Sequence, residues 1–490
     1  MSRAKPRSPE RSITAGSDFL HLDIAEAPPG GRADWLATRL RQAIADGRLP
    51  VGGRLPATRV LAADLGVSRG VVTEAYQRLV EDGQVAGRGR AGTVVVAAPA
   101  AAPAPPPAAA PAPVTLFPRA PGAHVFDAVR AVPARVDLTP GVPDLAAFPR
   151  AAWLRAERTV LRQLAASDFG YGDPRGAPAL RAAVAAWLAR SRGVAVDPAE
   201  VIVTTGVSQA LGVLAQALRP YGITRIAVED PGSLGVRQHL NNWQVDTPPV
   251  AVDDAGLRVD ELAASGVAAV MLTPAHQFPT GVVLDGERRR QLVAWARAGG
   301  LVVEDDYDAE HRYDRPPVPA LRALLPDQVC YAASVSKLLA PALRVGWLLV
   351  PPRYREAVVE ARRNADLGNA VLPQLVLAEL MTSGALERQL RMLRRRHVRR
   401  RDAMISALAR HLPGATVHGA AAGLHLMVTL PGDVPDTEVA AGALERGVKV
   451  QPLSWHCQRE HRPGLVLGYA ANPPSTIEEG IATVAAVLRG

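Results

Sequence analysis

Near the N-terminus, apolar residues recur at the spacing of amphipathic helices. A first helix carries this face on Leu36, Leu40, Ala43 and Ile44. A second, short helix opens at Pro56 and is followed by a tight turn at Gly66-Val67. Ser68 is a good N-cap for a third helix. The stripe expected to face inward on that helix consists of Val71, Val72, Ala75, Tyr76, Leu79 and Val80.

A short pattern typical of a β-hairpin follows these helices. Gln84-Val85 and residues 93–96 are the expected strands, and the Gly/Arg-rich segment 87–92 joins them. Three helices and a hairpin are the plan of a winged helix-turn-helix, whose recognition helix enters the DNA major groove by its N-terminal residues. Arg69 and free backbone N–H groups there can meet phosphates and base edges. The pattern leaves one alternative open, a small helical protein-binding domain with a solvated arginine loop.

From about residue 125 onwards, short apolar strands alternate with helical segments, which predicts a mostly parallel sheet flanked by helices. Strands are expected at 201–204, 225–228, 268–272 and 301–303. Polar residues or glycine follow each strand, as at Gly206, Asp230, Thr273 and Asp305. Open α/β sheets bind their ligands at these carboxyl ends, so a site is expected there.

Between the two patterned regions, residues 97–114 are almost only alanine and proline. Such a tract cannot bury a core and has few backbone donors, so we expect a semi-rigid linker, partly in the polyproline II conformation, that reaches about 50 Å. The predicted organisation is therefore a small unit at 18–96, a linker at 97–124 and a large unit at 125–490.

The composition narrows the class of protein. A hydrophobic content of 48% supports a large core, and the two cysteines, Cys330 and Cys457, are too few for a disulfide framework. The net charge of +9 permits a polyanionic partner without establishing one. No apolar run is long enough to span a membrane, and the polar start lacks a signal peptide, so we expect a cytoplasmic protein.

Lysine is almost absent from the chain. Among 56 basic side chains, only Lys5, Lys337 and Lys449 are lysines. A guanidinium stays protonated, whereas a lysine amine can lose its proton and condense with an aldehyde to a Schiff base. Lys337 is therefore a candidate for covalent attachment of a cofactor. The alternative is that it merely survived a codon bias favouring Ala, Arg, Gly and Pro.

Residues at neighbouring strand ends can complete such a site. Ser334, Ser336 and Arg344, with the helix start at Val207-Ser208, can hold a phosphate. Asp305 and Tyr307 lie two apart at a strand end and so on one face, where they can meet a pyridine nitrogen and a ring oxygen. Together these parts describe a pyridoxal 5′-phosphate (PLP) site. Singly, each has a structural alternative: a helix cap for Asp305 or Asp306, a rim aromatic for Tyr307, a surface arginine for Arg344.

Four motifs give the small unit a specific resemblance. They are Gly47-Arg48-Leu49-Pro50, Leu55-Pro56-Ala57-Thr58-Arg59, Leu65-Gly66-Val67-Ser68-Arg69 and Ala75-Tyr76-Gln77-Arg78-Leu79. With them, the unit resembles the DNA-binding domain of GntR-family regulators. The resemblance implies that the residues facing DNA are Arg59, Ser68, Arg69, Gly70 and Thr73, with Gly92 at the tip of the wing. Gly70 is a departure, because many relatives carry Thr or Asn there.

Six motifs of the large unit appear in order along the chain. They are Tyr171-Gly172-Asp173-Pro174, residues 205–209, residues 229–232, Phe278-Pro279-Thr280-Gly281, Glu304-Asp305-Asp306-Tyr307 and residues 336–344. With them, the unit resembles fold-type I PLP-dependent aminotransferases. The resemblance implies that Lys337 carries PLP. It also implies that Tyr171 reaches the cofactor phosphate of the other subunit, which makes a homodimer with shared sites.

A GntR-like head, a long linker and an aminotransferase-like domain are the plan of the MocR subgroup of GntR regulators. Three departures from active aminotransferases stand out. Ser233 replaces an aromatic residue that stacks on the cofactor ring. Phe278 stands where aminotransferases have asparagine, and His276 or Gln277 is expected to supply its hydrogen bond. An apolar residue, near Val466, occupies the place of the arginine that binds the substrate carboxylate, which weakens amino-acid binding.

The leading hypothesis is a dimeric, DNA-binding transcriptional regulator rather than an enzyme. Its large unit senses PLP or an amine that reacts with PLP, and it controls vitamin B6 metabolism. One rival is a PLP-dependent aminotransferase with an appended DNA-binding domain. Another is a regulator that keeps the fold but has lost the cofactor.

Overall fold

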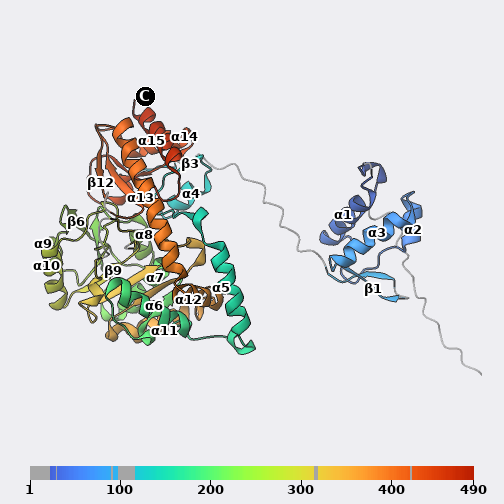
Figure 1. Cartoon of the computed structure of the whole chain (residues 1–490), viewed down its shortest axis with the longest axis horizontal. Coiled ribbons are helices and arrows are strands. Elements are labelled where there is room, and N and C mark those ends of the chain that lie inside the picture. The colour runs from blue at the N-terminus through green and yellow to red at the C-terminus, as the bar shows by residue number, and fades with distance from the viewer. Residues whose placement is uncertain are drawn as a thin grey trace, which may run out of the picture. The chain divides into compact units, whose positions relative to one another are not determined.

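The computed structural model of the chain describes residues 22–28, 30–89, 92–97, 116–308, 310–313, 318–419 and 422–489. It divides into two compact units, Met1–Val114 and Thr115–Gly490, which are described separately (Figure 1). Most of the predicted Ala/Pro linker, residues 98–115, lies outside the described residues.

The small unit consists of three helices and a two-stranded antiparallel hairpin. The helices are α1 (Arg32–Ala45), α2 (Thr58–Asp64) and α3 (Arg69–Glu81), and the strands are β1 (Val85–Gly87) and β2 (Thr93–Val95). A 3-10 turn at Ile24–Glu26 precedes α1. Val85 pairs with Val95 across the hairpin, and both pack on the helices in one core with Leu36, Leu40, Leu61 and Leu79. The winged helix-turn-helix plan predicted from the sequence is what the chain forms.

Helix α3 buries a narrower stripe than the sequence predicts. Val72, Ala75, Tyr76 and Leu79 are buried, whereas Val71 is half-buried and Val80 is 48% exposed. The buried positions follow a strict three-and-four spacing, and Val80 lies beyond the edge of that face. Helix α2 also begins at Thr58 instead of Pro56. Ser68 stands at the N-cap position of α3, but its side chain makes no capping hydrogen bond.

An eight-stranded sheet forms the centre of the large unit, in the order β4-β11-β10-β9-β8-β5-β6-β7. The strands are β4 (Ile202–Thr204), β5 (Ala227–Asp230), β6 (Pro249–Asp253), β7 (Gly256–Leu257), β8 (Ala269–Leu272), β9 (Leu301–Asp305), β10 (Val329–Ser334) and β11 (Gly346–Leu349). Neighbouring strands from β6 to β10 are parallel, and β11 is antiparallel to both β10 and β4. The carboxyl ends of β4, β5, β8, β9 and β10 therefore lie along one edge.

Side chains alternate between the two faces of this sheet, and helices cover both faces. Tyr331 and Trp347 share one hydrophobic cluster with Trp187 of α6 (Pro178–Arg192) and Leu377 of α12 (Val371–Thr382). Their neighbours Ala332 and Leu348 share another with α7 (Val207–Leu218) and α11 (Pro352–Asp366). The remaining helices around the sheet are α5 (Arg150–Gln163), α8 (Leu234–Asn242), α9 (Val259–Ala264) and α10 (Gly286–Arg297).

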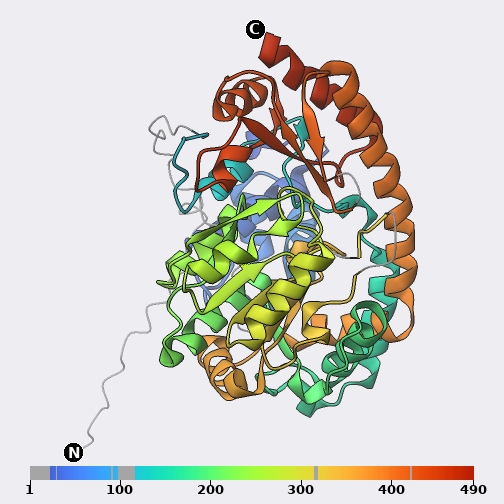
Figure 2. The same cartoon turned by 90° about the vertical axis from the view of Figure 1, so that its left-hand side faces the viewer.

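A smaller antiparallel sheet gathers the C-terminal strands in the order β12-β13-β16-β15. These are β12 (Thr416–His418), β13 (His425–Thr429), β16 (Gly464–Gly468) and β15 (Gln451–Pro452). Strand β14 (Val448–Lys449) pairs instead with β3 (Val136–Asp137). Helices α14 (Asp436–Glu445) and α15 (Pro474–Arg489) and the long helix α13 (Ala385–His411) complete this part, and α13 runs along one side of the large unit in both views (Figure 2).

The large unit begins earlier in the chain than the Val125 start that the sequence indicates. Helix α4 (Val125–Ala131) is preceded by Phe117, which is 5% exposed and stacks on Trp455 with ring centroids 5.5 Å apart. Because this aromatic contact packs Phe117 into the core of the large unit, the residues around it belong to that unit, although composition alone assigns them to the linker.

Candidate functional site

A cleft of about 1170 Å³ opens at the carboxyl edge of the large sheet. Most of the residues predicted for a cofactor site line it: Val207, Ser208, Asp305, Tyr307, Ser334, Ser336, Lys337 and Arg344. Two do not. Tyr171 is 94% exposed on the surface of the unit, and His276 is buried behind Tyr307. The edge of the sheet thus brings together residues that span more than a hundred positions of the sequence.

Lys337 follows the end of β10 and reaches into this cleft. Its Nζ donates a hydrogen bond to the carbonyl oxygen of Gly141 at 2.5 Å. A Cβ on Gly141 would lie 2.9 Å from Nζ, and the φ of this residue is +82°, a backbone conformation that favours glycine. Burial lowers the pKa of the amine, and Asp305 and Asp308 oppose this effect. The amine is therefore easier to deprotonate than an exposed lysine, as a nucleophile must be.

Asp305 and Asp306 are neighbours with different tasks. Asp306 is 2.6 Å from Nε of Arg192 in a buried ion pair, and it accepts the hydroxyl of Tyr331 at 2.5 Å. Oδ1 of each aspartate is buried without a hydrogen-bond partner among the described residues, but only Asp305 lines the cleft. Burial, with the nearby charges of Asp306 and Asp308, raises the pKa of Asp305 to about 8. Asp305 is therefore the carboxyl group that is free to meet a ligand.

Tyr307 is held in place from behind. Its hydroxyl lies 2.9 Å from Nδ1 of His276, and the same nitrogen lies 2.9 Å from Oδ2 of Asp308. Burial and the Asp308 charge raise the pKa of Tyr307 well above its usual value, so the phenol keeps its proton and can donate it. His276 therefore contacts the tyrosine and not the space of the cleft. Gln277, the other substitute considered for asparagine, bonds to its own loop and to the carbonyl of Pro231, and it also interacts with Glu229.

An anion-binding corner lies where α7 begins. Gly206 has a φ of +111° and precedes the helix, whose first backbone N–H groups have no helical acceptors. A Cβ on Gly206 would lie 3.5 Å from both terminal nitrogens of Arg344, so the guanidinium is next to the helix start. Ser334 and Ser336 line the same cleft. Guanidinium, hydroxyls and a helix N-terminus together suit a phosphate. His239 of α8 also lines the cleft, and burial and Arg344 lower its pKa.

The C-terminal strands supply the opposite wall. Val466 is fully buried in a cluster with Met427 and Leu453, against which Phe278 packs. The apolar position near Val466 is thus part of a packed core. Ser233 caps α8 by accepting a hydrogen bond from the backbone of Val236 at 3.3 Å. Ser233 thus offers a cap and Val466 an apolar contact, and neither offers an aromatic ring or a charge.

Several polar residues of this wall were not predicted from the sequence: His425, Lys449, Gln451 and His456. Lys449 and Gln451 lie in two-residue strands, which are too short for pattern analysis, and His456 ends a short 3-10 helix. Only the scarcity of lysine marks one of them in advance, because Lys449 is one of the three lysines of the chain.

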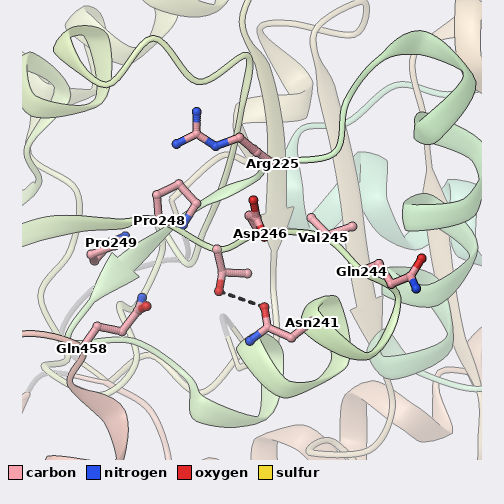
Figure 3. A pocket seen from close by; sticks show the side chains of 9 residues that line it. Arg225, Asn241, Gln244, Val245, Asp246, Pro248, Pro249 and Gln458 are labelled. Atoms are coloured by element: carbon pink, nitrogen blue, oxygen red, sulfur yellow. Dashed lines mark hydrogen bonds between the residues drawn. The ribbon is translucent and has the colours of Figure 1, made fainter.

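A second hollow, of about 530 Å³, lies at the C-terminal end of α8 (Figure 3). Arg225, Asn241, Gln244 and Gln458 line it, and Asn241 accepts a hydrogen bond from Thr247 at 3.1 Å. It contains none of the predicted site residues. The Lys337 cleft is therefore the candidate site of the large unit.

The predicted DNA-facing residues of the small unit are all exposed: Arg59, Ser68, Arg69, Gly70, Thr73 and Gly92. Arg69 donates from Nε to the hydroxyl of Thr58 at 3.3 Å, and Thr73 bonds to the carbonyl of Arg69 at 2.9 Å. The start of α3 thus presents a positioned arginine and free backbone donors, as a recognition helix does. Within the described ranges, no helix is both long and apolar enough to cross a bilayer.

The two units together define a helix-turn-helix protein that carries an aminotransferase-fold domain. Residues 33–95 match the family described as bacterial regulatory proteins, gntR family, and residues 135–482 match aminotransferase class I and II. Two similar proteins match along almost their whole length. One is the probable rhizopine catabolism regulatory protein MocR of Rhizobium meliloti, 33% identical, with 91% of each chain covered. The other is the HTH-type pyridoxine biosynthesis transcriptional regulator PdxR of Corynebacterium glutamicum, 32% identical, covering 92% of this chain and 94% of that one.

Among solved structures, the large unit is similar to LysN, an α-aminoadipate aminotransferase from Thermus thermophilus. The identity is 26% and the TM-score 0.66, with 72% of this chain and 92% of that chain covered. That structure contains N-(5′-phosphopyridoxyl)-L-leucine. The chain belongs to the MocR-type GntR-family transcriptional regulators. The family and the fold class predicted from the sequence are confirmed.

Proposed function

We propose that this regulator binds PLP in the Lys337 cleft and uses it to sense an amine. The observation that carries the proposal is the unpaired, buried Oδ1 of Asp305, which lines the same cleft as the Lys337 amine and the Arg344 corner. A buried polar atom without a partner is costly unless a ligand satisfies it. The three groups match the ring nitrogen, the aldehyde and the phosphate of PLP.

Each residue has a definite task in this proposal. Bound PLP supplies an aldehyde that reacts reversibly with primary amines. Lys337 holds the cofactor covalently, and Asp305 keeps its ring nitrogen protonated. Tyr307 donates to its ring oxygen, and His276 and Asp308 orient Tyr307. The start of α7 at Val207-Ser208, with Ser334, Ser336 and Arg344, binds its phosphate. Tyr171, exposed in one chain, is proposed to reach the site of a second subunit in a homodimer.

Regulation is favoured over amino transfer by the buried Val466. Active transaminases hold a substrate carboxylate with a bidentate arginine. The sequence resemblance aligns that arginine with Val466, which lies in an apolar cluster. Exchange of the Lys337 linkage for a free amine would instead bias the arrangement of the large units and so the spacing of the DNA-binding heads. Because one relative is named for control of pyridoxine biosynthesis, we propose a PdxR-type role in vitamin B6 metabolism.

The first test is an absorbance spectrum of the purified protein with PLP, before and after borohydride, beside Lys337→Ala. We expect an absorbance band near the edge of the visible range in the wild type and none in the variant. Borohydride should make the attachment of the cofactor to the wild-type chain irreversible. Lys449→Ala is the matched control, since it removes the other lysine of the cleft and should keep the band. No band in either protein would refute covalent binding and favour a regulator that has lost the cofactor. A reducible band that persists in Lys337→Ala would refute the assignment of the linkage to Lys337.

The rival, an aminotransferase with a DNA-binding head, is tested by turnover. Amino donors and keto acids are supplied to the PLP-loaded protein, and product is compared with the amount of protein. We expect at most about one product per site, because no arginine holds the donor carboxylate in place. Sustained multiple turnovers would establish the enzyme instead.

A further inference from the structure

A strap of residues 139–147 runs along the cleft and is attached to the large unit at both ends. Most of its residues line the cleft. Just before the strap, the carbonyl oxygen of Leu138 accepts the N–H of Gly468 of β16 at 2.7 Å. At its far end, Gln389 of α13 donates to the carbonyl oxygen of Ala147 at 2.6 Å. The strap thus connects the cleft to the long helix α13.

Lys337 holds the middle of the strap. The structure gives one donor for the carbonyl oxygen of Gly141, the amine of Lys337, at 2.5 Å from it. When such an amine condenses with an aldehyde, the aldehyde oxygen leaves as water, and the nitrogen becomes doubly bonded to carbon with at most one hydrogen. A lysine nitrogen bonded to the cofactor therefore no longer has the ammonium hydrogens with which it holds the strap.

We propose that the strap responds to the state of Lys337: the free amine holds it through Gly141, and covalent attachment of the cofactor releases it. The inference rests on the proposed function and adds to it the route by which a change at Lys337 leaves the cleft. An amine that displaces Lys337 from the cofactor frees the lysine again, so the strap returns to its held position.

Asp144 passes this change to α13. It is 3% exposed, and its Oδ2 lies 2.7 Å from Nε of Arg396 and 2.8 Å from Nη1 of Arg400. Arg400 also donates to the carbonyl oxygen of Ala470 in a buried hydrogen bond. Separating a buried carboxylate from its guanidinium partners is costly. The strap and this part of α13 therefore move together instead of separately.

A second contact joins Lys337 to the same part of α13. Nε2 of His311 lies 3.3 Å from the carbonyl oxygen of Lys337, and the His311 ring meets the ring of His397 edge-on, with centroids 5.0 Å apart. Both ring nitrogens of His397 are buried without a hydrogen-bond partner among the described residues. The His397 ring can therefore shift against His311 without breaking a hydrogen bond of its own.

The test is hydrogen–deuterium exchange of the full-length protein, with mass spectrometry of peptides that cover the strap and residues 393–400. In the cofactor-free protein, Lys337→Met should make the strap exchange about tenfold faster, as the loss of a charge-assisted hydrogen bond allows. Lys449→Met is the matched control, because it removes the amine of the other lysine of the cleft, whose Nζ bonds to the carbonyl of Arg130 and not to the strap.

Lys337→Arg separates covalent attachment from mere occupancy of the cleft. Its guanidinium can donate to Gly141 but is a poor nucleophile towards an aldehyde. PLP should therefore make the strap exchange about tenfold faster in the wild type and leave it unchanged in Lys337→Arg. Asp144→Asn should keep the response of the strap to PLP and remove the response of residues 393–400. Uptake of PLP is measured by absorbance in every variant.

Equal exchange of the strap in the cofactor-free wild type and Lys337→Met would overturn the inference and leave the proposed function standing, since this comparison needs no cofactor. A strap that exchanges no faster in the wild type after PLP has bound would overturn it as well. A response of residues 393–400 that persists in Asp144→Asn would overturn the role of Asp144. A wild type that takes up no PLP would overturn the proposed function, and the inference would fail with it.

Discussion

The two walls of the Lys337 cleft differ in how they treat charge. The wall from the large sheet carries Asp305, Lys337 and Arg344, whose charges match a cofactor. The wall from the C-terminal strands keeps its histidines neutral and buries Val466 where a cation is expected. Under the proposed function, the first wall holds the cofactor and the second wall decides what reacts with it. The fold alone does not distinguish a sensor from a catalyst, so the comparison of the two walls is the more informative one.

The largest effect is expected at Asp306, which supports the sheet wall without facing the cleft. Asp306→Asn leaves Arg192 charged and buried, and we expect a loss of about 3 kcal/mol in the free energy of unfolding. Urea unfolding of the cofactor-free protein measures it. The double variant Arg192→Met, Asp306→Asn should recover part of the loss, because it removes the buried guanidinium, although Glu304 and Glu310 then lose its charge as well. Full stability of the single variant would show that Glu304 and Glu310, which also act on Arg192, suffice.

Asp305→Asn, one residue earlier, should leave stability intact and weaken the binding of PLP. The pKa of about 8 means that burial disfavours the charged carboxylate in the cofactor-free protein, so removing the charge should keep or raise stability. Without a carboxylate for the ring nitrogen, affinity for PLP should fall about tenfold or more, as the loss of a charged hydrogen bond requires. Titration with PLP, followed by absorbance, measures this.

The two aspartate variants together decide which carboxyl group serves the cofactor. If Asp306→Asn lowers PLP affinity in a protein that remains folded while Asp305→Asn does not, the assignment of the two residues is reversed. A loss of both properties in both variants would mean that the pair acts as one unit.

Asp305, Asp306 and His276 show how much of the candidate site can be predicted from the sequence alone. The motif at residues 304–307 places the carboxyl groups at a strand end, but the strand pattern does not say which one turns into the cleft. The orientation of the two carboxyl groups depends on Arg192, more than a hundred positions earlier, which forms an ion pair with Asp306. His276 was predicted to contact the cofactor because its neighbours match a loop motif. Its ring lies behind Tyr307 because Asp308 holds it there.

The C-terminal wall was the hardest part to predict. Lys449 enters the cleft because β14 pairs with β3, which joins Val448 to Val136 across the whole unit. Two-residue strands carry no periodic signal, so no local pattern announces such a contact. The fold, by contrast, follows from motifs that recur in order along the chain and from the clear alternation of strands and helices.

The smallest predicted effect concerns the neutral histidines of the C-terminal wall. Nδ1 of His456 accepts the backbone N–H of Leu234 at 3.3 Å, and Nε2 lies 3.1 Å from Oε1 of Gln451, to which it donates. Both bonds require the neutral ring, and burial lowers its pKa from 6.5 to about 3. An unfolded chain takes up this proton below pH 6.5 and the folded chain does not. The stabilisation is therefore complete above pH 6.5 and is lost as the pH falls from 6.5 towards 3.

His456→Asn tests this by changing a slope. The variant lacks the titrating ring, so between pH 6.5 and 5 its stability should fall less steeply than that of the wild type, by about 1 kcal/mol per pH unit. At pH 7.5 it should be the less stable protein, because asparagine is too short to bond to both Leu234 and Gln451. Urea unfolding at several pH values measures both effects. His411→Asn is a suitable control, since that histidine bonds to Glu478 outside the cleft. Parallel pH profiles for His456→Asn and the wild type would show that His456 does not contribute to the loss of stability at low pH. The next residue to test would be His425, whose pKa is also lowered to about 3.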